Sequence, residues 1–371
     1  MSTRILVDLL FFTGTRGGME TVARRLYSSL PDDVLGRVEL VGLASRELAR
    51  QGADWFPGEL IDSRIPSSSA PVWAVAELLA GAWERRVRPD VIHSPANFGP
   101  WLTRAPRVVT IHDLLSFRHP EYVPGRLAAV QRALLRGTAR AASRVITVSE
   151  ASAADIVGYL GVAPGKIDVV PPAGSGRHAE PGEREDRLLF SLGNRLPHKN
   201  FPLLLEALAL IEPSARPGLV LPGGGAEDPL APLVERLGLG GSVRLAGWLA
   251  QSEVDRLYAR ATALVFPTRF EGFGLPVLEA MSAGCPVLCS DLPVLREVGA
   301  DAAAYVDTTS AERLAEAITA LLADAPRRAE LSASGIARAA EFSWEATARG
   351  TIASLERAAA DGVGQGRSPG K

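Results

Sequence analysis

The sequence has few cysteines, no long apolar run and almost no net charge. Cys285 and Cys289 are the only cysteines in 371 residues, and they flank a predicted strand, so we expect core thiols rather than a disulfide or metal site. No apolar stretch reaches the length of a membrane span, and residues 4–10 are too short for a signal peptide, which favours a cytoplasmic protein. A net charge of −2 argues against a strongly basic nucleic-acid-binding protein.

The length of the chain and the order of its elements predict two α/β domains. A chain of 371 residues is too long for one ordinary core, and both halves alternate short buried strands with helices, as doubly wound parallel sheets do. A stretch rich in proline, glycine and charge separates the halves. We therefore expect an N-terminal domain over 1–170, a linker over 171–186, a C-terminal domain over 187–345, a last helix over 346–360 and a disordered polar tail over 361–371.

Within these domains the hydrophobic pattern predicts individual elements. In the first half we expect strands at 4–8, 38–43, 91–93, 108–111 and 145–148, and helices at 19–30, 71–83 and 126–142. In the second half we expect strands at 188–192, 219–221, 243–245, 263–266, 287–290 and 303–306, and helices at 201–210, 230–237, 251–260, 311–322, 327–342 and from 345.

The segment 266–281 holds two carboxylates, Glu271 and Glu279, eight residues apart. It reads as a loop from a buried strand into a helix, because Pro276 suits a first helical turn. Glycines 272 and 274 let the backbone approach a ligand closely, and the free N–H groups at the helix start favour an anion. Together these features favour a polyhydroxylated, phosphorylated ligand. The alternative is that both glutamates are solvated and the glycines only form a turn.

A second anion site is predicted after the strand at 188–192. Arg195 and Lys199 precede the helix at 201–210, where cations oppose the helix dipole, so a shared anion such as a diphosphate explains them better than a structural role. The glycines at 223–225 either line the same nucleotide pocket or form a plain loop.

The first half carries three weaker signals. A glycine-rich loop with Gly17 and Gly18 opens the first helix but lacks the dinucleotide fingerprint. His112 follows the strand at 108–111, at the strand end where ligands gather, and its alternative role is structural. Four arginines recur every fourth residue: Arg132, Arg136, Arg140 and Arg144. At least the first three share a basic helix face that is either solvated or able to meet anionic lipid.

The segment at 266–287 closely resembles the signature of retaining family-4 glycosyltransferases of the GT-B fold. The match covers Glu-Gly-Phe-Gly-Leu-Pro at 271–276, then Glu279, and the trailing Ala280, Gly284, Pro286 and Val287. The resemblance implies two Rossmann-like domains facing a cleft and a nucleotide-sugar donor. It implies that Glu279 holds the ribose hydroxyls, that Glu271 lies near the transferred sugar, and that the N–H groups of Phe273, Gly274 and Leu275 contact sugar and phosphate.

The same resemblance extends over nearly the whole chain. It places Lys199 at the donor diphosphate within a motif that usually reads Arg-Lys-Asn, where His198 here replaces the arginine and Arg195 is displaced. It implies that Gly17 and Gly18 lie on the acceptor side of the cleft, that His112 reaches toward the sugar, and that the last helix crosses back to the first domain.

The sequence therefore predicts a retaining hexosyltransferase that acts on a glycan, lipid-linked or small-molecule acceptor. Residues 110–122 resemble mannosyltransferase-like members, which favours mannose and a GDP-hexose over a UDP-hexose donor. No cofactor is expected, and no metal, since the chain has no Asp-x-Asp and the cations can neutralise the diphosphate. A peripheral contact with anionic membrane is a further hypothesis. The alternatives are a GT-B epimerase or phosphorylase, or a catalytically silent carbohydrate-binding relative.

Overall fold

The chain folds into two compact units. The structure is a computed structural model that describes residues 2–13, 17–67, 81–123, 125–174, 184–225 and 227–365. Unit 1 comprises Met1–Pro172 and Trp344–Lys371, and unit 2 comprises Ala173–Ser343. The middle of the predicted linker, 175–183, lies outside the described residues, and so does most of the helix predicted at 71–83.

Unit 1 is built on a seven-stranded parallel sheet in the order β3-β2-β1-β4-β5-β6-β7. Its strands are β1 (Thr3–Leu9), β2 (Val38–Ala44), β3 (Glu59–Asp62), β4 (Val91–Ser94), β5 (Arg107–Ile111), β6 (Arg144–Thr147) and β7 (Ile167–Val169). Five consecutive residues at the end of β1 are buried, because helices cover both faces of a parallel sheet. The strand order reverses between β1 and β4, which is where such sheets bind ligands.

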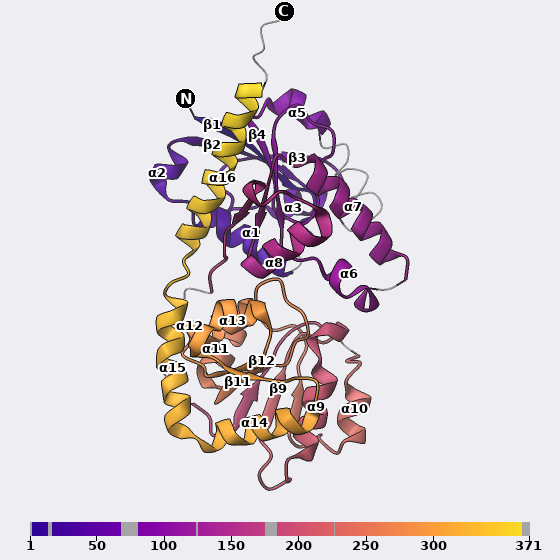
Figure 1. The fold of residues 1–371 in the computed structure, drawn as a ribbon, viewed down its shortest axis with the longest axis vertical. Coiled ribbons are helices and arrows are strands. Elements are labelled where there is room, and N and C mark those ends of the chain that lie inside the picture. The colour runs from indigo at the N-terminus through magenta and orange to yellow at the C-terminus, as the bar shows by residue number, and fades with distance from the viewer. Residues whose placement is uncertain are drawn as a thin grey trace, which may run out of the picture. The chain divides into compact units, whose positions relative to one another are not determined.

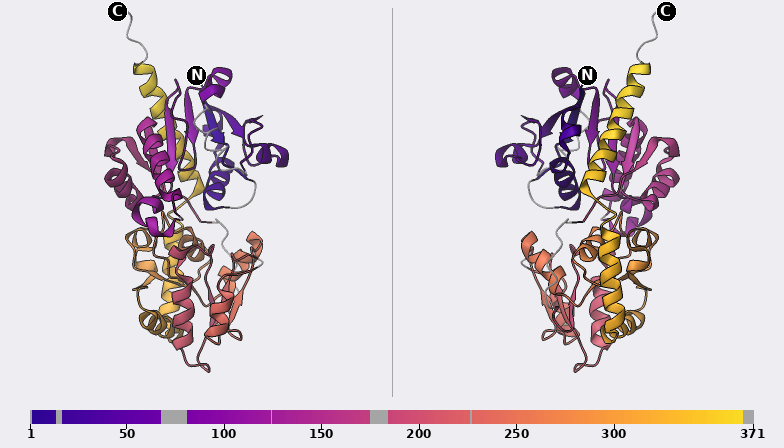
Figure 2. Two further views of the ribbon diagram at one scale, coloured as in Figure 1. Left: turned by 90° about the vertical axis from the view of Figure 1, so that its right-hand side faces the viewer. Right: turned by 90° about the vertical axis from the view of Figure 1, so that its left-hand side faces the viewer.

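The helices of unit 1 include one from the far end of the sequence. They are α1 (Gly18–Ser28), α2 (Asp32–Leu35), α3 (Arg46–Gln51), α5 (Gly81–Val87), α6 (Leu115–Arg118), α7 (Leu127–Ala141), α8 (Glu150–Asp155) and α16 (Trp344–Gln365). Figure 2 shows α16, in yellow, running beside the strands of this unit in both side views. Ala348, Ile352, Leu355 and Ala358 of α16 are fully buried in the same core as β1 and α1. The C-terminal helix is therefore part of the first unit's core.

Unit 2 repeats this architecture with a six-stranded parallel sheet in the order β10-β9-β8-β11-β12-β13. Its strands are β8 (Leu188–Phe190), β9 (Gly218–Leu221), β10 (Val243–Leu245), β11 (Ala263–Phe266), β12 (Val287–Ser290) and β13 (Ala304–Val306). Its helices are α9 (Phe201–Leu210), α10 (Ala231–Arg236), α11 (Gln251–Arg260), α12 (Leu275–Ser282), α13 (Pro293–Gly299), α14 (Ala311–Ala323) and α15 (Ala325–Ala339). Figure 1 shows α9 and α12 on opposite sides of this sheet. The order reverses between β8 and β11.

The predicted two-sheet α/β fold class is confirmed, and so are most element positions. Both cysteines are buried core residues, and burial raises their thiol pKa, to about 11 for Cys285. Within the described residues, no helix is both long and apolar enough to cross a membrane.

Two points of the prediction need correction. The edge strands β3 and β7 and the helix α13 were not predicted, because three to seven residues carry too little periodicity. The last helix runs to Gln365, so the tail does not begin at 361. At that point Gly362 lies so close to the ring of Pro106 that a Cβ would sit 2.4 Å from it. Of the four spaced arginines, the first three lie on α7, whereas Arg144 lies in β6 and pairs with Asp168 in β7.

Candidate functional site

The carboxyl ends of β8 and β11 bring two predicted site residues together. Lys199 follows β8 in the turn Pro197–Lys199, and Glu271 lies in the loop after β11. The Lys199 Nζ donates to Glu271 Oε1 at 2.6 Å, and both side chains are largely buried, at 14% and 13% exposed. Because β8 and β11 flank the point where the strand order reverses, this ion pair marks the ligand-binding edge of the sheet.

Backbone hydrogen bonds fix the two loops against each other. The His198 carbonyl accepts from the Arg269 amide at 2.7 Å and from Thr268 Oγ1 at 3.1 Å. His198 itself is buried, as is the Thr268 side chain. Asn200 then adopts a left-handed conformation, with φ of 58°, and its Nδ2 donates to the Thr308 carbonyl at 3.1 Å. The Lys199–Glu271 pair is thus held by rigid neighbours on both sides.

The start of α12 is the place where the sequence predicts an anion cradle. Gly274 has φ of +108°, and a Cβ there would lie 2.6 Å from Leu295 Cδ2, so glycine is required. Among the described residues, the amides of Phe273, Gly274 and Leu275 donate to no carbonyl or side chain. The Phe273 ring is buried edge-on against Phe342, with 5.9 Å between centroids. Three oriented N–H groups therefore stand beside the ion pair, which favours a phosphate or another anion.

Glu279 lies on α12 and has a buried partner that the sequence did not indicate. The Tyr258 hydroxyl, from α11, donates to Glu279 Oε2 at 3.0 Å. Tyr258 is 2% exposed, and burial raises the pKa of its phenol well above 10, helped by the Glu279 charge. The phenol therefore remains protonated and keeps donating to the carboxylate.

Arg195 does not point to an open anion site, which corrects the expected role. All five of its N–H groups are already used: Nε and one Nη hydrogen bond the Asp228 carboxylate, and the other three bond the carbonyls of Gly193, Leu221 and Pro222. The pair is nearly buried, at 8% and 10% exposed. Burial alone would raise the pKa of Asp228, but hydrogen bonds from Arg195 and the Leu230 amide outweigh it and lower that pKa.

This arrangement makes Arg195 a brace between the loops that follow β8 and β9. Gly223 approaches the Gly193 carbonyl so closely that a Cβ would sit 2.3 Å from it, and its φ is +98°. The glycines at 223–225 are thus required, at least in part, by loop packing. Direct contact between Arg195 and a diphosphate would require the loss of one of its bonds.

In unit 1, Gly17 and Gly18 open α1. Gly17 is the N-cap and has an extended backbone, with φ of −150°. A Cβ at Gly17 or Gly18 would meet no atom of the described residues within 4 Å. Neither local conformation nor packing within the described residues therefore requires glycine here, and close approach of a ligand stays a prediction.

His112 lies at the carboxyl end of β5, where the sequence placed it. Its backbone N–H donates to Asn97 Oδ1 at 2.8 Å, and its Nε2 donates to the Pro95 carbonyl at 2.9 Å. Burial lowers the pKa of His112, although the Pro95 bond and Asp113 act in the opposite direction. At neutral pH the ring is therefore uncharged, with Nδ1 as a hydrogen-bond acceptor.

A second buried histidine supports this region. His93, in β4, is fully buried between the Tyr27 hydroxyl at Nδ1 and Thr110 Oγ1 at Nε2. Burial lowers its pKa to about 3, with a smaller effect from the His112 charge. The hydrogen bonds Tyr27–His93–Thr110 connect α1 to β4 and β5. Helix α1 begins at Gly18, and β5 ends directly before His112.

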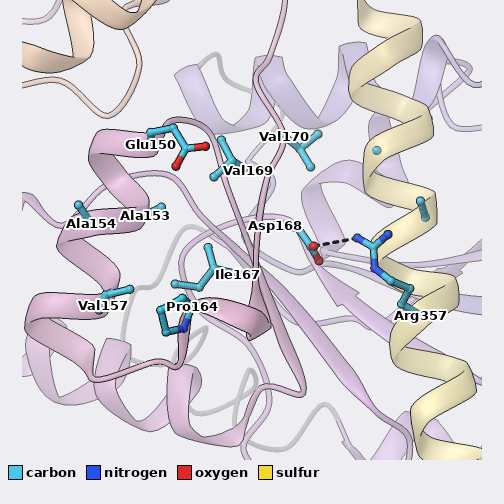
Figure 3. A pocket seen from close by; sticks show the side chains of 12 residues that line it. Glu150, Ala153, Ala154, Val157, Pro164, Ile167, Asp168, Val169, Val170 and Arg357 are labelled. Carbon is cyan, nitrogen blue, oxygen red and sulfur yellow. Dashed lines mark hydrogen bonds and ion pairs between the residues drawn. The ribbon is translucent and has the colours of Figure 1, made fainter.

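A cavity of about 610 Å³ lies elsewhere in unit 1, along β7 between α8 and α16. Figure 3 shows Asp168 pairing with Arg357 at one side and Glu150 at the other. None of the described residues that line it belongs to the predicted site. Within the described part of the chain, no three His, Cys, Asp or Glu side chains cluster as metal ligands would.

Comparisons with known proteins agree with this geometry. Residues 177–338 match the family described as "Glycosyl transferases group 1", and residues 16–173 match "Glycosyltransferase Family 4". The chain is 34% identical to the "O-antigen chain mannosyltransferase B" of Escherichia coli, covering 73% of this chain and 75% of that protein. It is 29% identical to the "D-inositol 3-phosphate glycosyltransferase" of Frankia alni, covering 85% and 92%.

A solved structure shows the same fold. The sucrose-phosphate synthase of Thermosynechococcus elongatus superimposes with a TM-score of 0.77 at 19% identity, covering 96% of this chain and 98% of that one.

Proposed function

Because the chain belongs to the group 1 glycosyltransferases of the GT-B fold, we propose that it transfers a hexose from a nucleotide diphosphate sugar to an acceptor hydroxyl with retention. The observation that carries this proposal is the Lys199–Glu271 pair beside the free amides of α12. An ammonium group has three N–H donors, and within the described residues one hydrogen bond of Lys199 is present, to Glu271. The other donors can bind the diphosphate without breaking the pair.

Each group then has a defined task. Lys199 and the amides of Phe273, Gly274 and Leu275 bind the diphosphate and stabilise the charge that builds up as it departs. Glu271 orients the transferred sugar and stabilises positive character at its anomeric carbon. His112, uncharged at neutral pH, accepts a hydrogen bond from a sugar hydroxyl. A departing phosphate oxygen takes the proton of the acceptor hydroxyl, so no protein nucleophile is assigned.

For the donor we propose GDP-mannose. This rests on the resemblance of residues 110–122 to mannosyltransferase-like members and on the 34% identity to a protein named as a mannosyltransferase. The Frankia alni relative is named for a different substrate, so the acceptor does not follow from these likenesses.

The test is isothermal titration of the full chain with GDP-mannose, UDP-glucose, UDP-galactose and UDP-N-acetylglucosamine. We expect binding to GDP-mannose, and slow donor hydrolysis without acceptor that gives α-mannose first, as seen by proton NMR. The same hydrolysis should persist in EDTA, because Lys199 and the amides replace a metal. Absence of binding to every donor would overturn the proposed function. Loss of turnover in EDTA with recovery in magnesium would overturn metal independence.

We further propose that α7 contacts anionic membrane. The helix carries Arg132, Arg136 and Arg140, and the Arg136 guanidinium stacks on the Phe117 ring at 4.8 Å. Arginines that recur every fourth residue share one helix face, and each contributes about 1 kcal/mol at an anionic lipid surface.

Liposome flotation tests this contact. We expect retention on vesicles containing phosphatidylglycerol, weakened by salt and by glutamine at positions 132, 136 and 140. A control with glutamine at the exposed Arg236, Arg244 and Arg313 of unit 2 should bind like the wild type. Equal retention on neutral and anionic vesicles would end the proposal.

A further inference from the structure

Two helices of unit 2 meet around a buried tyrosine that carries no predicted role. Tyr258 lies on α11, its ring packs edge-on against Phe190 with centroids 5.0 Å apart, and its hydroxyl donates to Glu279 Oε2 at 3.0 Å. Phe190 is the last residue of β8, directly before the loop that carries Lys199. The phenol is therefore held between the sheet and the carboxylate of α12.

Arg184 fixes the two helices at their carboxyl ends. Its Nη1 donates to the carbonyls of Tyr258, Ala259 and Ala261, at 2.8 to 3.0 Å, where α11 ends. Its Nη2 donates to the Ala283 carbonyl at 2.9 Å, directly after α12. One guanidinium thus satisfies helix-end carbonyls on both helices. With the spacing of α11 and α12 set, the distance from the Tyr258 hydroxyl to Glu279 is set as well.

We propose that Tyr258 is a positioning residue that holds the Glu279 carboxylate in the orientation that receives the ribose hydroxyls of the donor. The inference rests on the proposed function and on the role that the family resemblance implies for Glu279, which is to hold the ribose hydroxyls. A glutamate side chain has three rotatable bonds, and its rotamer entropy must be lost before it can accept two hydroxyls at once. The Tyr258 hydroxyl is a hydrogen-bond donor whose position is fixed by its buried ring and by the Arg184 contacts to α11. Its bond to Glu279 removes most of that rotamer freedom before the nucleotide binds.

A merely structural tyrosine would satisfy the same contacts, so the test needs a readout specific to ribose. Tyr258→Phe keeps the ring against Phe190 and removes only the hydroxyl. Isothermal titration then compares GDP with 2′-deoxy-GDP, or UDP with 2′-deoxy-UDP if the wild type binds uridine nucleotides more tightly. The matched control is Tyr305→Phe, because Tyr305 in the same unit donates to the carbonyls of Leu295 and Ala300 instead.

We expect Tyr258→Phe to weaken binding of the ribonucleotide roughly three- to tenfold, the size of one ordinary intramolecular hydrogen bond, and to weaken the deoxynucleotide less. The preference for ribose should fall in the same way in Glu279→Gln, and Tyr258→Phe/Glu279→Gln should bind no more weakly than Glu279→Gln alone. Tyr305→Phe should keep the wild-type preference.

Three outcomes separate the two proposals. If the wild type binds the ribonucleotide and Tyr258→Phe keeps its full preference for ribose, the positioning role is wrong and the proposed function stands. If the effects of Tyr258→Phe and Glu279→Gln add fully, the two groups act independently and the role is also wrong. If the wild type binds no nucleotide or nucleotide sugar, the proposed function fails. Should Tyr258→Phe unfold at the temperature used, Arg184→Lys gives the same comparison, because it loosens the helix clamp and keeps the hydroxyl.

Discussion

The two units share a strand order and differ in the groups at the carboxyl ends of their strands. In unit 2 these groups are charged and paired, as in Lys199–Glu271 and Arg195–Asp228. In unit 1 they include two buried histidines that are uncharged at neutral pH, His93 and His112. The same architecture thus presents charged side chains in unit 2, which suit an anionic ligand, and neutral imidazoles in unit 1, which suit hydroxyl groups. Four predictions test whether this difference is real.

The largest expected effect comes from the brace in unit 2. Arg195→Met leaves the Asp228 carboxylate nearly buried without its partner, which should lower the free energy of unfolding by about 3–5 kcal/mol. Thermal unfolding measures this, and Arg313→Met is the control, because that pair is exposed at 66% and 39% and its loss should change stability far less. If Arg195→Met kept full stability and lost binding of the sugar donor, Arg195 would be a diphosphate ligand rather than a structural brace.

The next effect concerns the ion pair at the site. Glu271→Gln should lower kcat about 10²- to 10³-fold, because the interaction strengthens as the sugar gains positive charge. Lys199→Ala should lower it similarly, and the double variant should be little worse than either, since the two groups act as a unit. The rate of donor hydrolysis, measured for the wild type, both single variants and the double variant, completes this double-mutant cycle. Asp291→Asn, which breaks the exposed pair with Arg296, is the control, and fully additive losses would show that the pair is incidental.

Glu279 should behave differently from Glu271 although both lie on one segment. In the role that the family resemblance implies, Glu279 makes the same contacts to ribose before and during reaction. Glu279→Ala should therefore raise the donor KM by the equivalent of roughly 1.5–3 kcal/mol, with little change in kcat. Steady-state kinetics with varied donor separates the two constants. A loss confined to kcat would mean that the roles of the two glutamates are exchanged.

The smallest effect belongs to unit 1 and depends on pH. The pKa of His93 is about 6.5 in the unfolded chain and about 3 in the folded protein, because burial disfavours the charged ring. The folded state therefore loses stability as the pH falls from about 6.5 toward about 3. From pH 7 to pH 5 the loss due to His93 should reach about 2 kcal/mol and should be absent in His93→Gln. Urea unfolding followed by tryptophan fluorescence reports mainly on unit 1, which holds Trp55, Trp73, Trp83, Trp101 and Trp344. An identical pH dependence of stability in the wild type and in His93→Gln would contradict the lowered pKa of His93.

The sequence allowed the fold and the placement of several candidate site residues to be predicted, because these residues are close in the chain. Glu271, Gly274 and Glu279 lie within one strand-loop-helix segment, and Lys199 stands just before a helix. The partners of these residues could not be predicted in the same way. Tyr258 and Glu279 lie 21 residues apart, Arg195 and Asp228 lie 33 apart, and no local periodicity connects them.

Arg195 illustrates why a local pattern can mislead. A cation before a helix favours an anion, but the pattern does not distinguish a ligand from a carboxylate of the same protein. Asp228 supplies that carboxylate, and the carbonyls of Gly193, Leu221 and Pro222 occupy the remaining donors. The expected roles of Lys199, Glu271 and Glu279, like those of Gly17, Gly18 and His112, stay predictions, since the structure places these residues but contains no ligand.

The placement of α16 bears on how the protein is made. Unit 2 is one continuous stretch, Ala173–Ser343, whereas unit 1 needs Ile352 and Leu355 from the end of the chain for its core. During synthesis, domains generally fold as they emerge, N-terminal first. Here the order should be reversed: unit 2 can complete its core on the ribosome while unit 1, although synthesised earlier, waits for the last helix. Nascent chains that end near 340 should therefore expose an unfinished first sheet to chaperones and proteases.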